Sequence, residues 1–215
     1  RVRKAMEPLA GKADWQATLG LAQALGCDWD YESPEQIMRE ISALTPTFNG
    51  VTYEKIERWG SIQRPCWDEA SEGTPTMHEE SFTRGLGQFI VTEYVPTDER
   101  CTRRFPLILT TGRILSQYNV GAQTRRTENS AWHEEDVLEI HPEDAEERGI
   151  AEGDWVGISS RMGDTVLHAR LSQRVRPGVV YTTFHHPVSG ANVITTDSSD
   201  WATNCPEYKV TAVQI

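Results

Sequence analysis

The sequence predicts a mixed fold in which a helical segment is followed by a small closed β-barrel. Two observations support this prediction. Apolar residues recur at helical spacing before residue 60, whereas after residue 105 they occur in short runs separated by glycine-containing turns. The chain has 215 residues, which suffices for one large domain or two small ones. We therefore place a domain boundary near residue 105, between a helical segment with its connector at 1–105 and a barrel at 106–215.

Three helices are predicted in the N-terminal segment, at about residues 14–25, 34–45 and 52–59. Asp14 is expected to cap the first helix, which Gly26 ends. The second helix is the best marked, because Ser33 can cap it and Pro34 fits its first position. Gln36 completes the pattern of a capping box.

Residues 60–105 carry several prolines and glycines and are predicted to form a loop-rich connector with short strands near 88–94. Beyond the connector the spacing is that of strands, interrupted by one short helix at 142–148. Turn signals such as Gly153-Asp154 separate the runs, which is typical of a small closed barrel. The predicted strands lie at residues 107–111, 137–140, 155–158, 165–169, 179–184 and 208–213.

Charge and composition exclude several classes of protein. Lysine and arginine number 21 and aspartate and glutamate 32, so the formal net charge of −11 disfavours nucleic acid as a partner. No apolar run approaches the roughly 18 residues of a membrane-spanning helix, and no apolar leader follows Arg1. The four cysteines form no C-x-x-C pair and are expected to be small buried hydrophobes. We therefore expect a cytoplasmic protein with no membrane or nucleic-acid partner.

Carboxylates are missing from two stretches of this acidic chain. Residues 100–127 contain no Asp or Glu, where the average density would place about four, and residues 165–196 contain none either. A buried phosphate or pyrophosphate requires this pattern, because a nearby carboxylate would repel it in a poorly screened pocket. The alternative is chance together with surface arginines. The basic residues of the two stretches are Arg100, Arg103, Arg104, Arg113, Arg125, Arg126, His168, Arg170, Arg174, Arg176, His185 and His186.

Most catalytic and nucleotide-binding motifs are absent from the sequence. There is no Walker A loop, no complete dinucleotide fingerprint, no G-x-S-x-G elbow and no H-E-x-x-H pair. A pyruvoyl-forming Gly60-Ser61 pair is an alternative, but no decarboxylase site is recognisable in the chain. A nucleophilic Cys205 with His185 or His186 is another, but no orienting partner is identifiable. The loop at 111–126 remains, with two glycines, neutral hydrogen-bonding side chains and flanking arginines. It is suited to an anionic, nitrogen-rich ligand.

Five segments of the chain carry a family resemblance. They are Thr110-Thr111-Gly112-Arg113 with its loop, residues 140–156, residues 177–180 with Phe184-His185-His186, residues 192–197, and Pro206-Glu207-Tyr208-Lys209. With these segments the chain resembles the C-terminal part of the catalytic subunit of molybdenum- or tungsten-dependent formate dehydrogenases, in particular the cytoplasmic NAD-linked type. The segment at 140–156 resembles the whole molybdopterin-dinucleotide-binding superfamily. The histidine pair, the T-T-D stretch at 195–197 and the P-E-Y-K ending resemble formate dehydrogenases more specifically.

The resemblance implies a double-psi β-barrel of the aspartate-decarboxylase-like, molybdopterin dinucleotide-binding kind, preceded by a helical segment that completes an upstream α/β domain. It also implies a bis-molybdopterin guanine dinucleotide cofactor with molybdenum or tungsten. Backbone N–H groups and Arg113 would hold its pyrophosphate, and Lys209 would act as a point charge. The implied cofactor contacts are Gly112, Arg113, Leu115, Gln117, Tyr118, Asn119, Phe184, His185, Asn192, Tyr208 and Lys209.

The chemistry itself has no counterpart in this sequence. In the family that it resembles, the metal ligand, the substrate-binding residues and the cysteines of the iron-sulfur clusters belong to sequence well upstream. The start at Arg1 instead of methionine agrees with the tail of a larger chain. The resemblance therefore implies a module that binds and orients the cofactor and is not catalytic by itself.

The enzyme that the resemblance implies converts formate and NAD⁺ to carbon dioxide and NADH. Its electrons would pass from the metal through iron-sulfur clusters to FMN and NAD on partner subunits. One alternative is the same module of another molybdopterin oxidoreductase, of the nitrate reductase type. The other is a non-enzymatic double-psi barrel that serves as an adaptor for protein partners.

Overall fold

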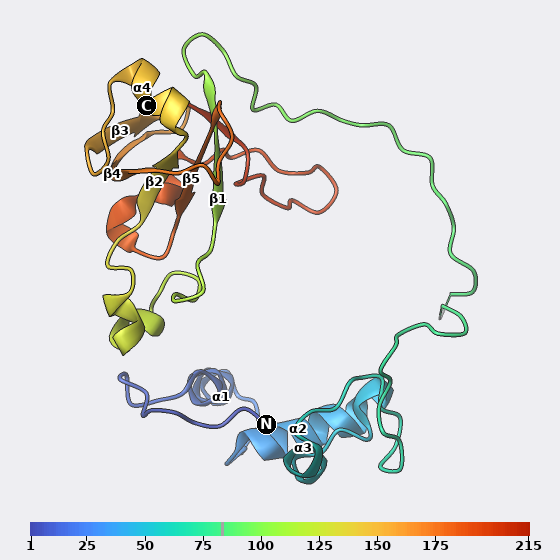
Figure 1. Cartoon of the computed structure of the whole chain (residues 1–215). Coiled ribbons are helices and arrows are strands. Elements are labelled where there is room, and N and C mark those ends of the chain that lie inside the picture. Colours follow the sequence, from blue (N-terminus) through green and yellow to red (C-terminus); the bar gives the residue numbers. More distant parts are fainter. Residues whose placement is uncertain (83) are drawn as a thin grey trace. The chain divides into compact units, whose positions relative to one another are not determined.

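The computed structural model describes residues 1–82 and 84–215, and the chain divides into two compact units at residues 1–91 and 92–215 (Figure 1). The first unit is helical, and the second is built around a β-sheet. None of the helices in the described residues combines the length and the apolar character needed to cross a bilayer. The predicted connector is divided between the two units, and the expected domain boundary near residue 105 stays a prediction.

The helical unit contains α1 (Asp14–Ala24), α2 (Pro34–Leu44) and α3 (Tyr53–Trp59), close to the predicted positions. Ser33 caps α2 as expected, because its hydroxyl accepts the N–H of Gln36 at 3.3 Å. The prediction that Asp14 caps α1 is wrong. Ala13 occupies the N-cap, and its N–H donates to the side chain of Gln16 at 2.9 Å. The amide of Gln16 therefore satisfies the helix start in place of a capping carboxylate.

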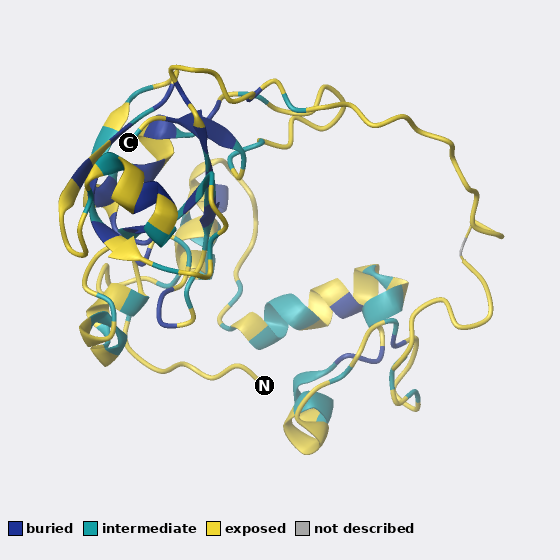
Figure 2. Ribbon diagram, turned by 45° about the horizontal axis from the view of Figure 1, so that its top comes forward, coloured by how far each residue is buried: buried dark blue, intermediate teal, exposed yellow. Residues whose placement is uncertain are grey.

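The apolar side of α2 is only partly covered (Figure 2). Ile37 is half-buried, whereas Ile41 and Leu44 are 41% and 74% exposed. Among the described residues of this unit, the buried hydrophobic side chains are Ala22, Val51 and Cys66. The helical unit therefore has almost no core of its own.

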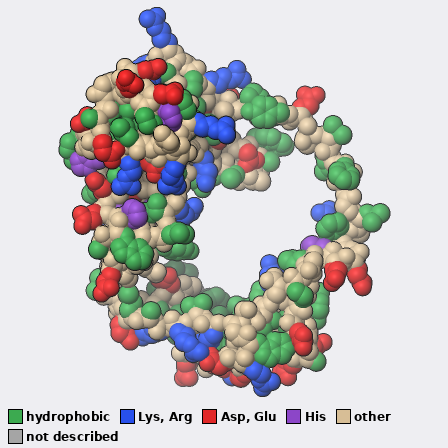
Figure 3. All heavy atoms as spheres, viewed as in Figure 1, with side chains coloured by type: hydrophobic (Ala, Val, Ile, Leu, Met, Phe, Trp, Pro, Cys, Tyr) green, Lys and Arg blue, Asp and Glu red, His purple; other side chains and the backbone are tan. Residues whose placement is uncertain are grey.

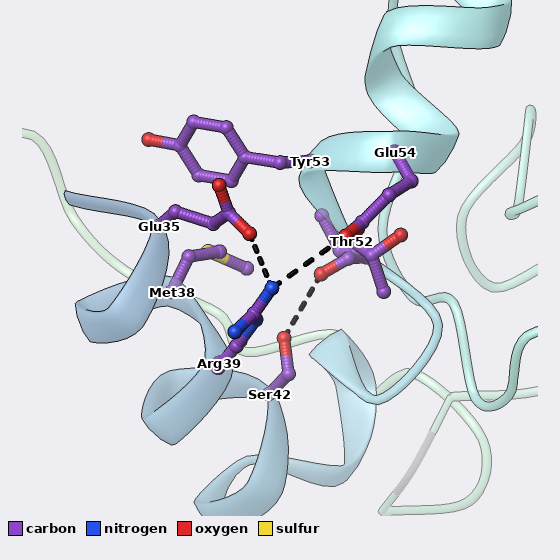
Figure 4. A pocket seen from close by; sticks show the side chains of 8 residues that line it. Glu35, Met38, Arg39, Ser42, Thr52, Tyr53 and Glu54 are labelled. Carbon is purple, nitrogen blue, oxygen red and sulfur yellow. Dashed lines mark hydrogen bonds and ion pairs between the residues drawn. The ribbon is translucent and has the colours of Figure 1, made fainter. Parts of the chain in front are cut away.

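A small cavity of about 180 Å³ lies between α2 and the start of α3 (Figure 4). Arg39 crosses it, with one guanidinium nitrogen 2.5 Å from the carboxylate of Glu35 and 3.6 Å from that of Glu54. The hydroxyl of Ser42 donates to the carbonyl of Val51 at 2.9 Å beside them. Because the arginine is paired with two carboxylates, the cavity presents no unpaired cation to a ligand.

The short strands predicted near residues 88–94 are wrong, because the structure has no regular element there. Phe89 and Val91 are 102% and 98% exposed. A strand needs a neighbouring strand for its backbone hydrogen bonds, and no strand pairs with this segment in the part of the chain that is described. The apolar residues that suggested strands are therefore left in solvent.

Six strands form one mixed sheet in the β unit, in the order β3-β4-β2-β5-β1-β6. They are β1 (Leu107–Gly112), β2 (Val137–Ile140), β3 (Trp155–Ser159), β4 (Asp164–Leu171), β5 (Val179–Thr183) and β6 (Thr211–Val213). All six predicted strands are present, although the last begins at Thr211 and not at Tyr208. The pairs β1–β5 and β2–β4 are parallel, and the pairs β1–β6, β2–β5 and β3–β4 are antiparallel.

The helix predicted between the strands is α4 (Pro142–Arg148). His141 caps it, since its imidazole accepts the N–H of Glu143 at 3.3 Å. The prediction that this is the only helix among the strands is wrong. The structure adds α5 (Ala191–Ile194) and 3₁₀ turns at residues 124–126, 128–131 and 187–189. These elements have three or four residues, too few to show a helical period in the sequence.

The sheet curls around a single apolar core until its two edges meet. Ser159, at the end of β3, forms a bridge with Gln214 just after β6, and two mutual N–H···O bonds of 2.9 Å join them. Residues at alternate positions point inward, as the period of a strand requires. The core consists of Leu107, Leu109, Leu138, Ile140, Ala145, Val156, Ile158, Leu167, Ala169, Val180, Ile194 and Val213.

The cysteines are distributed differently from the prediction. Cys66 is buried, whereas Cys27, Cys101 and Cys205 are exposed. The prediction that all four are small buried hydrophobes is therefore wrong for three of them. These three lie outside the helices and strands, so no element turns them toward a core.

A buried carboxylate holds the segment that leads into β1. Glu99 is 7% exposed, and its Oε2 lies 2.9 Å from Nη1 of Arg161. The same oxygen accepts the N–H of Ala212 in β6 at 2.8 Å. Glu99 therefore ties the segment before the sheet to both of its edges.

Replacing Glu99 with alanine should destabilise the β unit by about 2–4 kcal/mol, because Arg161 and the N–H of Ala212 both lose a buried partner. Thermal unfolding followed by circular dichroism would record this as a lower Tm. Glu93→Ala, at an exposed position of the connector, is the matched control and should leave the Tm unchanged. Equal Tm values for the two variants would contradict the role assigned to Glu99.

Candidate functional site

Because β1 and β5 are parallel neighbours, the loops that follow them leave the sheet at the same edge, the one formed by the carboxyl ends of these two strands. Gly112 at the end of β1 is paired with Thr183 at the end of β5, so the loops at 113–121 and 184–190 begin side by side. Each loop belongs to one of the two carboxylate-poor stretches of the sequence. The fold therefore brings these two stretches together.

The segment before β6 reaches the same edge, since β6 runs antiparallel to β1. The hydroxyl of Thr111 donates to the carbonyl of Tyr208 at 3.1 Å. Lys209 follows with an exposed side chain, and Asn192 is exposed on α5. In the described residues no hydrogen bond or ion pair joins the side chain of Asn192 or Lys209 to the loop at 113–121, so their approach to the loop stays a prediction.

A buried carboxylate lies where β2 begins and β5 ends. Asp136 is 2% exposed and accepts the hydroxyl of Thr183, the N–H of His185 at 3.1 Å and the N–H of His186 at 2.9 Å. The ring Nδ1 of His186 lies 3.2 Å from the same carboxylate. Burial raises the pKa of Asp136, but these hydrogen bonds outweigh it and hold the pKa below its ordinary value. The carboxylate is therefore ionised, and it fixes the turn that follows β5.

The ring of His185 joins the two loops. It is fully buried, its Nε2 accepts the N–H of Ile114 at 3.1 Å, and its Nδ1 donates to the carbonyl of Asn119. These partners assign a neutral ring with the proton on Nδ1. The loop approaches so closely that a Cβ at Gly121, where φ is +70°, would lie 2.6 Å from the carbonyl oxygen of His185. The sequence predicted His185 as a cofactor contact, and in the structure both of its nitrogens bind the backbone of the loop.

Arg113 is held at the surface by three contacts. Its guanidinium carbon lies 5.1 Å from the ring centre of Phe184, and its Nε donates to Oδ1 of Asn119 at 3.2 Å. The hydroxyl of Tyr181 donates to its carbonyl at 3.3 Å. The ring of Tyr181 leaves no room for a side chain at Gly112, where a Cβ would lie 2.6 Å from the phenol oxygen. The predicted residues Gly112, Arg113, Asn119 and Phe184 are thus brought together.

Gln117 carries a polar group that has no partner. The side chain is buried, its Oε1 accepts the hydroxyl of Thr124 at 2.6 Å, and its Nε2 makes no hydrogen bond with the described residues. On the same loop, Leu115 and Tyr118 are 107% and 66% exposed. A buried N–H donor next to exposed apolar side chains matches a ligand with hydrogen-bond acceptors on a flat ring. The loop therefore offers a hydrogen-bond donor and apolar side chains to such a ligand.

Basic side chains accompany these loops. A cavity of about 420 Å³ is lined by Arg125, Ser130, Ala131, Glu134 and His186. Figure 3 shows Lys and Arg side chains gathered on the β unit. Among the described residues, no cluster of three His, Cys, Asp or Glu side chains could hold a metal ion. This edge of the sheet is thus suited to holding an anionic organic ligand.

Sequence reasoning missed three residues of this site. Asp136 stands in the acidic run Glu134-Glu135-Asp136, which is typical of a solvated surface. Its only signal was its place directly before a predicted strand. Tyr181 was assigned to a strand and Thr124 to a loop. Neither pattern shows that the hydroxyl of Tyr181 reaches the carbonyl of Arg113, 68 positions away, or that the hydroxyl of Thr124 holds Gln117.

Residues 107–212 match the family described as the molydopterin dinucleotide binding domain. The β unit of this chain is therefore similar to that family over these residues, and it is a cofactor-binding domain of an enzyme. The chain as a whole is similar to alpha subunits of formate dehydrogenases. It is 36% identical to F420-dependent formate dehydrogenase 1 subunit alpha of Methanococcus maripaludis and 32% identical to formate dehydrogenase H of Escherichia coli.

These similarities cover 100% of this chain but 33% and 31% of the two relatives, so the chain spans about one third of their length. Among solved structures, acetylene hydratase from Pelobacter acetylenicus matches with a TM-score of 0.45 and 18% identity. That match covers 51% of this chain and 18% of the hydratase. The family match of residues 107–212 and the similarity to the alpha subunits indicate a formate dehydrogenase-like module with a molybdopterin cofactor domain.

Replacing Asp136 with asparagine should lower the stability of the β unit at pH 7 by about 1–3 kcal/mol. The folded pKa of Asp136 is lowered, so its ionised form stabilises the fold above the unfolded value of about 4, and this stabilisation is lost as pH falls through the folded pKa. The difference between wild type and Asp136→Asn should therefore shrink as the pH is lowered below about 4.

Urea unfolding at a series of pH values would measure this difference. Asp197→Asn, at an exposed position in the same unit, is the control and should match the wild type at every pH. A constant gap between Asp136→Asn and wild type across the acid range would show that the charge of Asp136 is not what stabilises the turn.

Proposed function

We propose that this chain is the molybdopterin dinucleotide-binding part of the catalytic subunit of a formate dehydrogenase. The observation that carries the proposal is the convergence of two carboxylate-poor loops at one edge of the sheet, where the buried Nε2 of Gln117 has no partner among the described residues. The family match of residues 107–212 and the similarity to formate dehydrogenase alpha subunits support it. The proposed ligand is bis-molybdopterin guanine dinucleotide with molybdenum or tungsten.

The charged groups are proposed to hold the phosphates of the cofactor. Arg113 is exposed, and Asn119 and Phe184 hold its guanidinium in place, so its remaining N–H groups can form paired bonds to phosphate oxygens. Lys209 adds a point charge from the segment before β6. The absence of Asp and Glu from residues 100–127 leaves Arg113 free of competing carboxylates in the sequence around it.

The neutral groups are proposed to orient the pterin. The amide of Gln117 donates to an acceptor on the pterin edge, because Thr124 already binds the amide oxygen. Leu115 and Tyr118 pack on the ring and exclude water from it. The further residues proposed to contact or support the cofactor are Gly112, His185, Asn192 and Tyr208.

The cofactor, when bound, supplies a metal centre for the oxidation of formate to carbon dioxide by two electrons. The residues of this chain bind and orient it, and the group that ligates the metal is proposed to belong to the upstream part of the same subunit. In this proposal the β unit provides no acid, base or nucleophile.

The finer fold is proposed to be a double-psi β-barrel, preceded by a helical segment that completes an upstream α/β domain. The bridge between Ser159 and Gln214, which joins the two edges of the sheet, supports the barrel. The exposed apolar side chains of α1 and α2, among them Leu21, Ile41 and Leu44, support the second part. Such side chains are stabilised when another layer of protein covers them.

The electron acceptor is proposed to be NAD, reached through iron-sulfur clusters and FMN on cytoplasmic partner subunits. This choice rests on the resemblance of the sequence alone. Three relatives are named F420-dependent formate dehydrogenases, which makes F420 the competing acceptor. The proposed role of the β unit is the same with either acceptor.

The full-length enzyme, purified with its partner subunits, should oxidise formate with an artificial dye and contain molybdenum or tungsten together with pterin. Reduction of NAD⁺, and not of F420, would support the proposed acceptor, and the reverse would replace it. Nitrate reduction without formate oxidation would identify the nitrate reductase type. A preparation without either metal and without pterin would favour the adaptor.

Arg113→Ala and Lys209→Ala should each weaken cofactor retention about tenfold, since a charge-assisted hydrogen bond contributes about 1.5–3 kcal/mol. Metal analysis and the fluorescence of the oxidised pterin measure the content of the purified enzyme. Arg170→Ala is the matched control. Arg170 is exposed and is paired with Glu139 near the end of β2, whereas the site lies where β2 begins. If both variants keep the pterin content of the control, these two residues do not hold the cofactor.

A further inference from the structure

One imidazole spans the loop that carries the predicted cofactor contacts. The Nε2 of His185 accepts the N–H of Ile114 at the start of the loop, and its Nδ1 donates to the carbonyl of Asn119 at the end. Gln117 lies between these two points, and Arg113 directly precedes the first. Any shift of the ring therefore moves both the pyrophosphate-binding and the pterin-binding groups.

The backbone that carries this ring is itself held by Asp136. Asp136 accepts the N–H of His185 at 3.1 Å and the N–H of His186 at 2.9 Å, which sets the direction in which the His185 side chain leaves the backbone. The loop closes over the same residue at Gly121, where only a hydrogen fits against the carbonyl of His185. The ring is 0% exposed, so its two nitrogens face the loop backbone and not a ligand.

We propose that His185 is a positioning residue: its neutral ring clasps both ends of the loop at 114–119 and so places Arg113 and Gln117 for the cofactor without touching it. This inference rests on the proposed function for the identity of the cofactor. It replaces a direct contact of His185 with an action through two hydrogen bonds. The clasp itself is a property of the protein alone, and it can be measured without the cofactor.

Two substitutions separate this role from simple packing. His185→Gln keeps one acceptor and one donor on a planar group, and it can bind the N–H of Ile114 and the carbonyl of Asn119. His185→Phe fills a similar volume with a ring but offers neither group. If hydrogen bonding positions the loop, His185→Gln should retain more cofactor than His185→Phe. If the ring only fills space, His185→Phe should retain more.

The experiment uses the full-length enzyme and compares the wild type with both variants. His185→Gln should keep pterin and metal contents within about twofold of the wild type, whereas His185→Phe should lose about tenfold, as expected for two lost hydrogen bonds. The same pair of substitutions at His168, on β4 and outside both loops, is the matched control and should leave the contents unchanged. The electron paramagnetic resonance signal of the reduced metal should be unchanged in His185→Gln and broadened in the cofactor that His185→Phe retains.

Hydrogen exchange of the Ile114 amide in the cofactor-free enzyme tests the clasp directly. This amide should be protected in the wild type and in His185→Gln, and it should exchange about tenfold faster in His185→Phe. Equal protection in all three proteins, or better retention of cofactor by phenylalanine than by glutamine, would overturn the inference. Loss of cofactor in both variants with an intact clasp would restore His185 as a direct contact. A wild type without pterin would end the proposed function, and the exchange measurement would still decide whether the clasp exists.

Discussion

The site depends on the hydrogen bonds that the ionised carboxylate of Asp136 accepts. An ion this deeply buried costs several kcal/mol unless hydrogen bonds replace its water shell. Here a hydroxyl and two backbone N–H groups surround it, and the ring of His186 lies beside them. The need to satisfy this one charge joins the start of β2 to the end of β5. The turn that carries His185 has its shape for this reason.

The imidazole of His185 connects that turn to the loop after β1 through two hydrogen bonds. A loop that is already ordered loses less conformational entropy when it binds a ligand. The unpartnered amide of Gln117 works in the same direction, because a buried donor without an acceptor destabilises the free protein by about 1–3 kcal/mol. A ligand that accepts this hydrogen bond removes that cost. This agrees with the proposal that the loop binds a cofactor.

The two units differ in how much stability each generates by itself. The β unit encloses a continuous core inside the curled sheet, and Glu99 anchors the segment before it. The helical unit buries few apolar side chains, and an ion pair between Arg39 and Glu54 joins α2 to α3. Because the chain spans about one third of the length of its relatives, this contrast agrees with the proposal that the helices complete a larger domain.

The sequence by itself determined the local elements and the chemistry of the ligand loop. Helix starts such as Ser33-Pro34, the period of the strands, and the arginines of two carboxylate-poor stretches are all encoded by neighbours in the chain. Only the tertiary structure decided which segments meet. The parallel pairing of β1 with β5 joins residues about 70 positions apart, the buried role of Asp136 is hidden in an acidic run, and the apolar segment at 88–94 found no strand to pair with. Pairing and burial depend on partners distant in sequence, and local patterns carry no information about those partners.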